Sequence, residues 1–76
     1  MPHVIVKIWP GPSEKQKALC ADKIVEALAA SLGTGEDSVS VAIEEVSPNA
    51  WIAQVYKPEI EANMAALYKK PGYGPF

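Results

Sequence analysis

Residues 2–16 read PHVIVKIWPGPSEKQ, and this stretch decides the fold. Its first part is an apolar run whose side chains alternate between two faces, which predicts a β-strand over residues 2–9. The sequence Pro10-Gly11-Pro12 breaks that strand. Ser13 is a good N-cap and Gln16 follows it by three residues, so the two form a capping box. We therefore predict a helix that begins at about residue 13.

The predicted helix extends to about residue 32 and ends at Gly33, a residue type that favours helix termination. Its apolar stripe repeats at helical spacing and consists of Ala21, Val25, Leu28 and Leu32. Alternating apolar and polar residues then predict a second strand over residues 38–46. Strand, helix and strand in this order form a βαβ unit, in which the two strands run parallel.

A short C-terminal helix is predicted over residues 58–69, because Pro58 suits the first position of a helix. Ser47-Pro48-Asn49 is interpreted as a turn, and residues 50–52 as the start of an irregular connection. The fold class is therefore α+β, with two parallel strands, a long crossover helix and a short C-terminal helix. We expect one domain over residues 1–76.

The small size of the chain predicts an oligomer. A domain of 76 residues buries only about 60% of its unfolded surface, and a two-stranded sheet leaves two unpaired edges. One cysteine and one histidine cannot supply an internal disulfide or a zinc site. We expect that oligomerisation completes the sheet, in a homodimer, with a hexamer as the second alternative.

The charged residues restrict the partners. The net charge is -2, and all seven basic side chains are lysines. Nucleic-acid surfaces favour a basic stripe with arginine, so no nucleic-acid partner is expected. No apolar run approaches the roughly 18 residues of a membrane span, and neither a signal peptide nor a disulfide pattern is present. We expect a cytoplasmic protein without membrane, metal or cofactor.

Pro2 is the candidate catalytic residue. Its side chain is small enough that removal of Met1 is expected, which exposes a secondary amine at the start of a strand. A free α-amino group has a pKa of about 7.7–8.0, so modest desolvation makes it a general base near neutral pH. The alternative is that Pro2 only gives the strand a rigid start.

Several of these features together resemble the tautomerase superfamily, in particular 4-oxalocrotonate tautomerase-like proteins. They are Pro2 before the first strand, Gly11 before the helix, the helix start SEKQK at residues 13–17 and the sequence SVSV at residues 38–41. The ending LYKKPGY at residues 67–73 is similar to the short bacterial branch with phenylpyruvate-type tautomerase activity, whose members form dimers.

The resemblance implies a cofactor-free isomerase that acts on 2-oxo acids, with Pro2 as the general base. The two arginines that hold substrate carboxylates in 4-oxalocrotonate tautomerases correspond here to Pro12 and Ser40, whereas their hydrophobic wall matches Trp51. Phenylpyruvate enol, a mono-acid with an aromatic tail, is therefore the expected type of substrate. Trp9, Ser40 and Trp51 are the expected substrate-binding residues.

Other interpretations of these residues remain open. Trp9 and Trp51 also suit a core or a subunit contact, and Ser40 also suits a solvated strand position. Lys69 and Lys70 are candidates to reach a substrate carboxylate, or they only place favourable positive charge near a helix end. Glu44 and Glu45 are candidates to activate water in a hydratase-like reaction, or they form one solvated face. His3 is interpreted as a satisfied surface or interface histidine in preference to a proton shuttle, and Cys20 as a small buried hydrophobe. The alternative function is a non-catalytic oligomeric binding module with the same fold.

Overall fold

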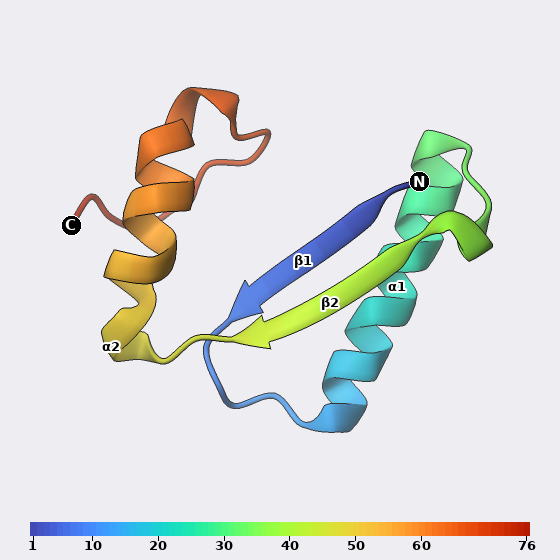
Figure 1. Cartoon of the computed structure of the whole chain (residues 1–76), viewed down its shortest axis with the longest axis horizontal. Coiled ribbons are helices and arrows are strands. Elements are labelled where there is room, and N and C mark those ends of the chain that lie inside the picture. Colours follow the sequence, from blue (N-terminus) through green and yellow to red (C-terminus); the bar gives the residue numbers. More distant parts are fainter. The chain divides into compact units, whose positions relative to one another are not determined.

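A computed structural model describes residues 1–76, which divide into two units, Met1–Glu45 and Val46–Phe76. We call them the strand unit and the C-terminal unit. The strand unit contains β1 (His3–Ile8), α1 (Glu14–Leu32), a short 3₁₀ turn (Glu36–Ser38) and β2 (Ser40–Glu45). The C-terminal unit is helical from Pro48 to Ala66 and ends in an irregular tail (Figure 1). No helix is both long enough and apolar enough to cross a membrane.

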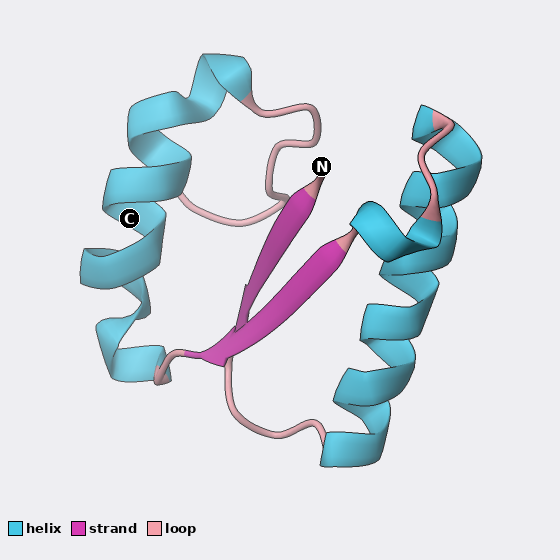
Figure 2. Ribbon diagram, turned by 45° about the vertical axis from the view of Figure 1, so that its right-hand side comes forward, coloured by secondary structure: helices cyan, strands magenta, loops and turns pink.

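The strand unit has the predicted βαβ order. β1 and β2 pair in parallel, with His3 opposite Ser40 and Ile8 opposite Glu45. Figures 1 and 2 show α1 alongside the two strands that it connects. The strands at residues 2–9 and 38–46 are thus confirmed, with slightly shorter observed bounds.

Both ends of α1 form as the sequence predicts. The Ser13 side chain accepts a hydrogen bond from the Gln16 N–H at 3.1 Å, and the Gln16 side chain accepts one from the Ser13 N–H at 2.8 Å. This capping box satisfies two donors at the start of α1. Gly33 ends α1 in the left-handed region at φ 66°, a conformation that glycine adopts without steric cost.

Alternation along the strands separates two faces of the sheet. Val6, Ile8 and Ile43 line a groove together with residues of the first half of α1, so these positions face the helix. Successive side chains point to opposite faces of a strand. His3, Ile5 and Lys7 of β1 therefore lie on the other face, as do their register partners Ser40, Ala42 and Glu44 of β2.

The prediction of a helix over residues 58–69 is wrong in its bounds. The helical run begins with α2 (Pro48–Trp51), continues as a π-helix (Ile52–Ile60) and ends as a 3₁₀ helix (Glu61–Ala66). Ser47 is the N-cap of α2, so Pro48 and not Pro58 occupies the first position. Pro58 lies inside the π-helical stretch. Proline has no N–H and its ring crowds the preceding turn, and a wider helical turn accommodates both effects.

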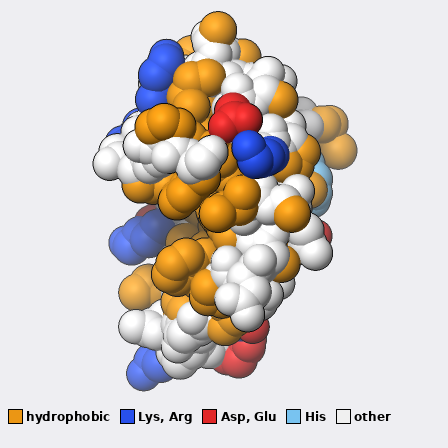
Figure 3. Space-filling model, turned by 90° about the vertical axis from the view of Figure 1, so that its left-hand side faces the viewer, with side chains coloured by type: hydrophobic (Ala, Val, Ile, Leu, Met, Phe, Trp, Pro, Cys, Tyr) orange, Lys and Arg blue, Asp and Glu red, His pale blue; other side chains and the backbone are white.

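The only two buried hydrophobic side chains, Val55 and Tyr56, both belong to the C-terminal unit. Tyr56 packs edge-on against Phe76 with 4.9 Å between ring centroids, and against Tyr73 at 5.9 Å. The strand unit contains no side chain buried to this degree, and Ile5 and Trp9 are about half exposed. Hydrophobic side chains cover much of the molecular face drawn in Figure 3.

Candidate active site

Pro2 is held at the start of the parallel sheet. The Ser40 N–H donates a hydrogen bond to the Pro2 carbonyl at 3.1 Å, immediately before the first paired residues of β1 and β2. Pro2 is half-buried, whereas Met1 beyond it is fully exposed. Met1 therefore contributes no packing, and its removal leaves the contacts of Pro2 in place. While Met1 is attached, the Pro2 nitrogen is an amide and has no basic lone pair.

Ser40 lies beside Pro2 and carries a second contact. Its hydroxyl is 2.6 Å from Nδ1 of His3, the residue after Pro2. His3 and Ser40 are register partners, so both side chains stand on the sheet face opposite α1. The structure thus brings together two predicted site residues, Pro2 and Ser40. The interpretation of His3 as a satisfied histidine is confirmed, since Ser40 is its partner.

The two tryptophans are placed separately. Trp9 follows the C-terminal end of β1, about 23 Å from Pro2 at 3.3 Å per strand residue. The strand therefore does not bring Trp9 to Pro2 within one chain. Trp51 is the last residue of α2 in the C-terminal unit, where its Nε1–H donates to the Tyr73 hydroxyl at 3.3 Å.

The sequence did not predict an apolar groove at the other end of the sheet. Its volume is about 250 Å³, and it lies between the strand ends and the first half of α1, lined by Val6, Ile8, Pro12, Gln16, Lys17, Cys20 and Ile43. Cys20 is exposed there, so its interpretation as a buried hydrophobe is wrong. Position 20 lies at the rim of the helical stripe, where the adjoining groove leaves the thiol open to solvent.

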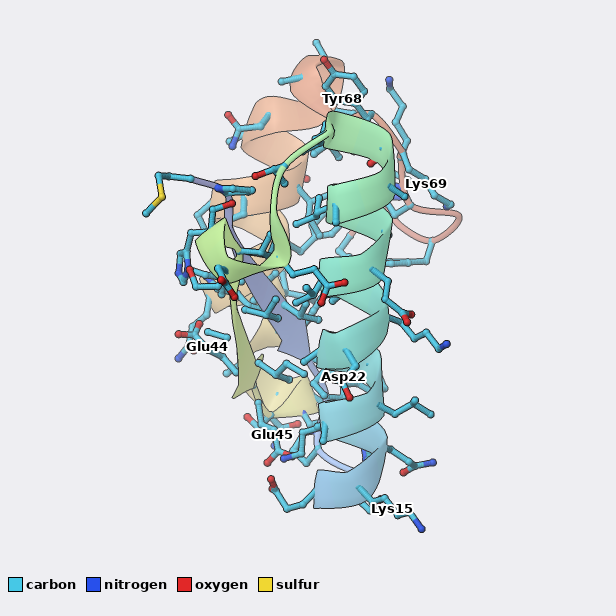
Figure 4. All side chains as sticks on the ribbon, turned by 90° about the vertical axis from the view of Figure 1, so that its right-hand side faces the viewer. Lys15, Asp22, Glu44, Glu45, Tyr68 and Lys69 are labelled. Carbon is cyan, nitrogen blue, oxygen red and sulfur yellow. The ribbon has the colours of Figure 1, made fainter.

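Lys17 in this groove is neutralised by two carboxylates. Its Nζ lies 2.9 Å from Glu14 Oε1 and 3.0 Å from Glu45 Oε2. The hydrogen bonds to Glu14 and then to Glu45 raise the pKa of Lys17 above its ordinary value. Figure 4 shows Glu45 beside the first turns of α1, whereas Lys15 and Asp22 project from the helix. Glu44 and Glu45 are both exposed, as expected, and Glu45 is in addition engaged in an ion pair.

No group of three or more His, Cys, Asp and Glu side chains is arranged to hold a metal ion. Lys69 donates to the Lys70 carbonyl at 3.2 Å, beyond the end of the helical run. Of the candidate site residues, Pro2, His3 and Ser40 lie together at the start of the sheet.

Comparison with known proteins identifies the chain. The family model described as "Tautomerase enzyme" matches residues 2–59. The chain belongs to the tautomerase family. A "Probable tautomerase" of Xylella fastidiosa is 45% identical over 74 residues, covering 97% of this chain and 90% of the relative. "Tautomerase PptA" of Pectobacterium carotovorum is 40% identical over 74 residues, covering 96% and 97%.

Solved structures support the same assignment. The fold matches that of TomN, a 4-oxalocrotonate tautomerase homologue in the tomaymycin biosynthetic pathway, with TM-score 0.64 and 30% identity over 66% of this chain and 77% of TomN. It also matches YwhB, a homologue of 4-oxalocrotonate tautomerase, with TM-score 0.59 and 35% identity over 60% and 75% of the two chains. This tautomerase is therefore an isomerase built on the predicted βαβ fold.

Proposed function

We propose that this tautomerase converts the enol of aryl-2-oxo acids such as phenylpyruvate to the keto form. Pro2 is the general base after Met1 has been removed. The observation that carries the proposal is the position of Pro2: it is half-buried, Ser40 fixes its carbonyl, and the neighbouring Met1 is fully exposed. The family match also begins at Pro2.

The reaction needs one proton acceptor that also becomes a donor. The neutral Pro2 amine removes the proton of the enol hydroxyl as the carbonyl double bond forms. The carbon–carbon double bond supplies its electron pair to the neighbouring carbon, which takes a proton from the Pro2 ammonium. The amine is regenerated, and no oxidant or reductant takes part. Partial burial of Pro2 favours its neutral form, because desolvation disfavours the charged one.

The charged side chains favour a mono-acid substrate. The chain contains no arginine, the residue whose planar fork binds carboxylates in two places at once. Lys17 is occupied by Glu14 and Glu45. The second carboxylate of a dicarboxylate therefore finds neither an arginine nor Lys17 to bind it. An aromatic tail needs no such partner. Trp51 is proposed as part of the hydrophobic wall for that tail, together with Trp9 of a partner chain, because a chain's own Trp9 lies at the far end of β1 from Pro2. Ser40 is proposed as a hydrogen-bond partner of the substrate.

We further propose a cytoplasmic homodimer that functions as one domain over residues 1–76. Both sheet edges are open in the single chain, and open edges readily pair with another strand. Ile5 and Trp9 also remain about half exposed. A partner chain is the expected means of covering this surface.

An enol-to-keto assay on Met1-free protein tests the base directly. Intact mass first establishes that Met1 is absent. The Pro2→Ala variant should lose a large part of the 10²–10⁴-fold in kcat/KM that general-base catalysis typically supplies, because the proline ring is lost. Some turnover should remain, because alanine keeps an amine at the same position. Pro10→Ala, in the exposed connection after β1, is the matched control and should leave turnover unchanged.

Protein that retains Met1 should be inactive, since its Pro2 nitrogen is an amide. Full turnover with Met1 attached, or an unaffected Pro2→Ala variant, contradicts Pro2 as the base. Absence of turnover in verified Met1-free protein would leave the non-catalytic binding module as the explanation of the fold.

A further inference from the structure

The hydrogen bond between His3 and Ser40 links the first rung of the sheet to the residue beside the proposed base. The two side chains are register partners, with 2.6 Å between Nδ1 and Oγ. The Ser40 N–H also holds the Pro2 carbonyl. His3 directly follows Pro2, and consecutive Cα atoms are about 3.8 Å apart. The His3–Ser40 pair therefore lies next to Pro2.

The direction of this hydrogen bond depends on the protonation of the imidazole. When Nδ1 carries no proton, the Ser40 hydroxyl donates to it, and the serine hydrogen is not available to a ligand. When both ring nitrogens are protonated, Nδ1–H donates to Oγ, and the hydroxyl hydrogen turns outward. Protonated His3 therefore makes Ser40 a donor and adds a positive charge beside it.

We propose that the His3–Ser40 pair is the carboxylate-binding element of the site, in which His3 positions the Ser40 hydroxyl as a donor to a 2-oxo acid anion. This inference rests on the proposed function, and it gives that site the cationic group that the absent arginines do not supply. A charge-assisted hydrogen bond is shorter and stronger than a neutral one. Histidine is also the side chain that changes charge near neutral pH.

The surrounding charges leave this role to His3. His3 is exposed, and its hydrogen-bond partner is the neutral Ser40 hydroxyl and not a carboxylate. On the same sheet face the charged residues are Lys7 and Glu44, which are register partners. Lys7 and Glu44 lie four residues along the strands from His3 and Ser40, which corresponds to about 13 Å. The 3₁₀ turn before β2 carries Glu36 and Asp37, and the amino group of residue 2 adjoins the pair.

Binding of benzoylformate tests the inference without turnover. This aryl-2-oxo acid has no hydrogen on the carbon beside its ketone, so it cannot enolise. The chain contains one histidine, so the imidazole ¹H and ¹⁵N signals in NMR belong to His3 alone. We expect benzoylformate to shift the His3 titration midpoint to higher pH and to bind about tenfold more tightly at pH 5.5 than at pH 8.

Two variants separate charge from hydrogen bonding. His3→Asn keeps a polar atom near the Nδ1 position but cannot become a cation, so binding should weaken about tenfold at pH 5.5 and keep only the pH dependence that the Pro2 amine contributes. Ser40→Ala should weaken binding by a similar factor, and Ser40→Thr should restore it. In turnover, His3→Asn should raise KM with little change in kcat. Ser31→Ala, whose hydroxyl bonds the Ala27 carbonyl on α1, is the control and should bind normally.

The outcomes distinguish this inference from the proposed function. An unchanged His3 titration on saturation with benzoylformate, or normal pH-dependent binding by His3→Asn, overturns the role of the pair, even if turnover depends on Pro2. A shifted titration in a protein without turnover supports the pair and contradicts the proposed reaction instead. Backbone amide spectra of each variant establish that it is folded.

Discussion

A methyl group added at Gly74 should release the C-terminal tail from Tyr56. Gly74 has φ +79°, and a Cβ there would lie 2.5 Å from the Tyr56 hydroxyl oxygen and 3.0 Å from Cζ. Tyr56 is only 1% exposed, so its ring has little room to move away. Phe76 and Tyr73, the two rings that pack on Tyr56, flank this position in the tail.

The expected cost is comparable with the energy that holds the tail. A left-handed conformation costs a non-glycine residue roughly 1–2 kcal/mol, and overpacking adds about 1–3 kcal/mol. Phe76 is 60% and Tyr73 45% exposed. With roughly 200 Å² per ring and about 25 cal/mol per Å², their buried parts contribute about 5 kcal/mol. Ordering four residues costs about 4–8 kcal/mol, so docking is nearly balanced.

A penalty of about 2 kcal/mol changes the ratio of docked to undocked tail by about 30-fold. The Gly74→Ala variant should therefore keep its helices but lose the ring-current shifts that Phe76 imposes on Tyr56 in the proton NMR spectrum. Gly72→Ala is the matched control, because no atom lies within 4 Å of its added Cβ. Tyr56→Phe in the Gly74→Ala background removes the nearest clashing atom and should restore part of the docking. Unchanged Tyr56 shifts in Gly74→Ala would refute this reasoning.

Three further results are expected. Sedimentation at micromolar concentration should give the mass of a dimer, and in thermal unfolding the Tm should rise with protein concentration. A folded monomer whose Tm does not depend on concentration would contradict the proposed assembly. Glu14 and Glu45 raise the pKa of Lys17 above 10.5. The contribution of these two ion pairs to the stability of the folded protein is therefore complete below pH 10.5 and is lost as the pH rises through the pKa of Lys17 in the folded state. The Tm difference between wild type and Lys17→Met should thus be constant from pH 7 to about pH 10 and narrow above it; an unchanged difference at pH 12 argues against the ion pairs. Finally, kcat/KM should be higher for phenylpyruvate enol than for a dicarboxylic dienol, and a tenfold opposite preference (about 1.4 kcal/mol) would show that lysines or backbone amides replace arginine.

Local signals made the first helix predictable. Ser13, Gln16 and Gly33 act within a few residues of one another, and each does in the structure what its chemistry predicts. The same kind of signal is present at Ser47-Pro48, an N-cap followed by proline, where the sequence also fits a turn. Proline suits both positions, so the dipeptide alone did not distinguish a turn from the start of α2.

The contacts that depend on distant residues were not predictable in the same way. Tyr56 lies in a stretch with no regular pattern, and its burial depends on Tyr73 and Phe76 at the chain end. Ser40 was singled out by resemblance, whereas its bond to His3 follows from a register between residues 37 apart in sequence. Sequence periodicity gives the faces of a strand but not which residues stand opposite each other.

That register also makes the site sensitive to the length of the connection between α1 and β2. One residue inserted between Gly33 and Val39, and absorbed as a one-residue slip of β2, would turn Ser40 toward α1 and place Val41 on the His3 face. A two-residue slip would keep the faces but carry Ser40 about 6.6 Å along the strand from His3. Neither arrangement retains the hydrogen bond. The number of residues in this connection is therefore under a constraint of its own, separate from their chemical identity.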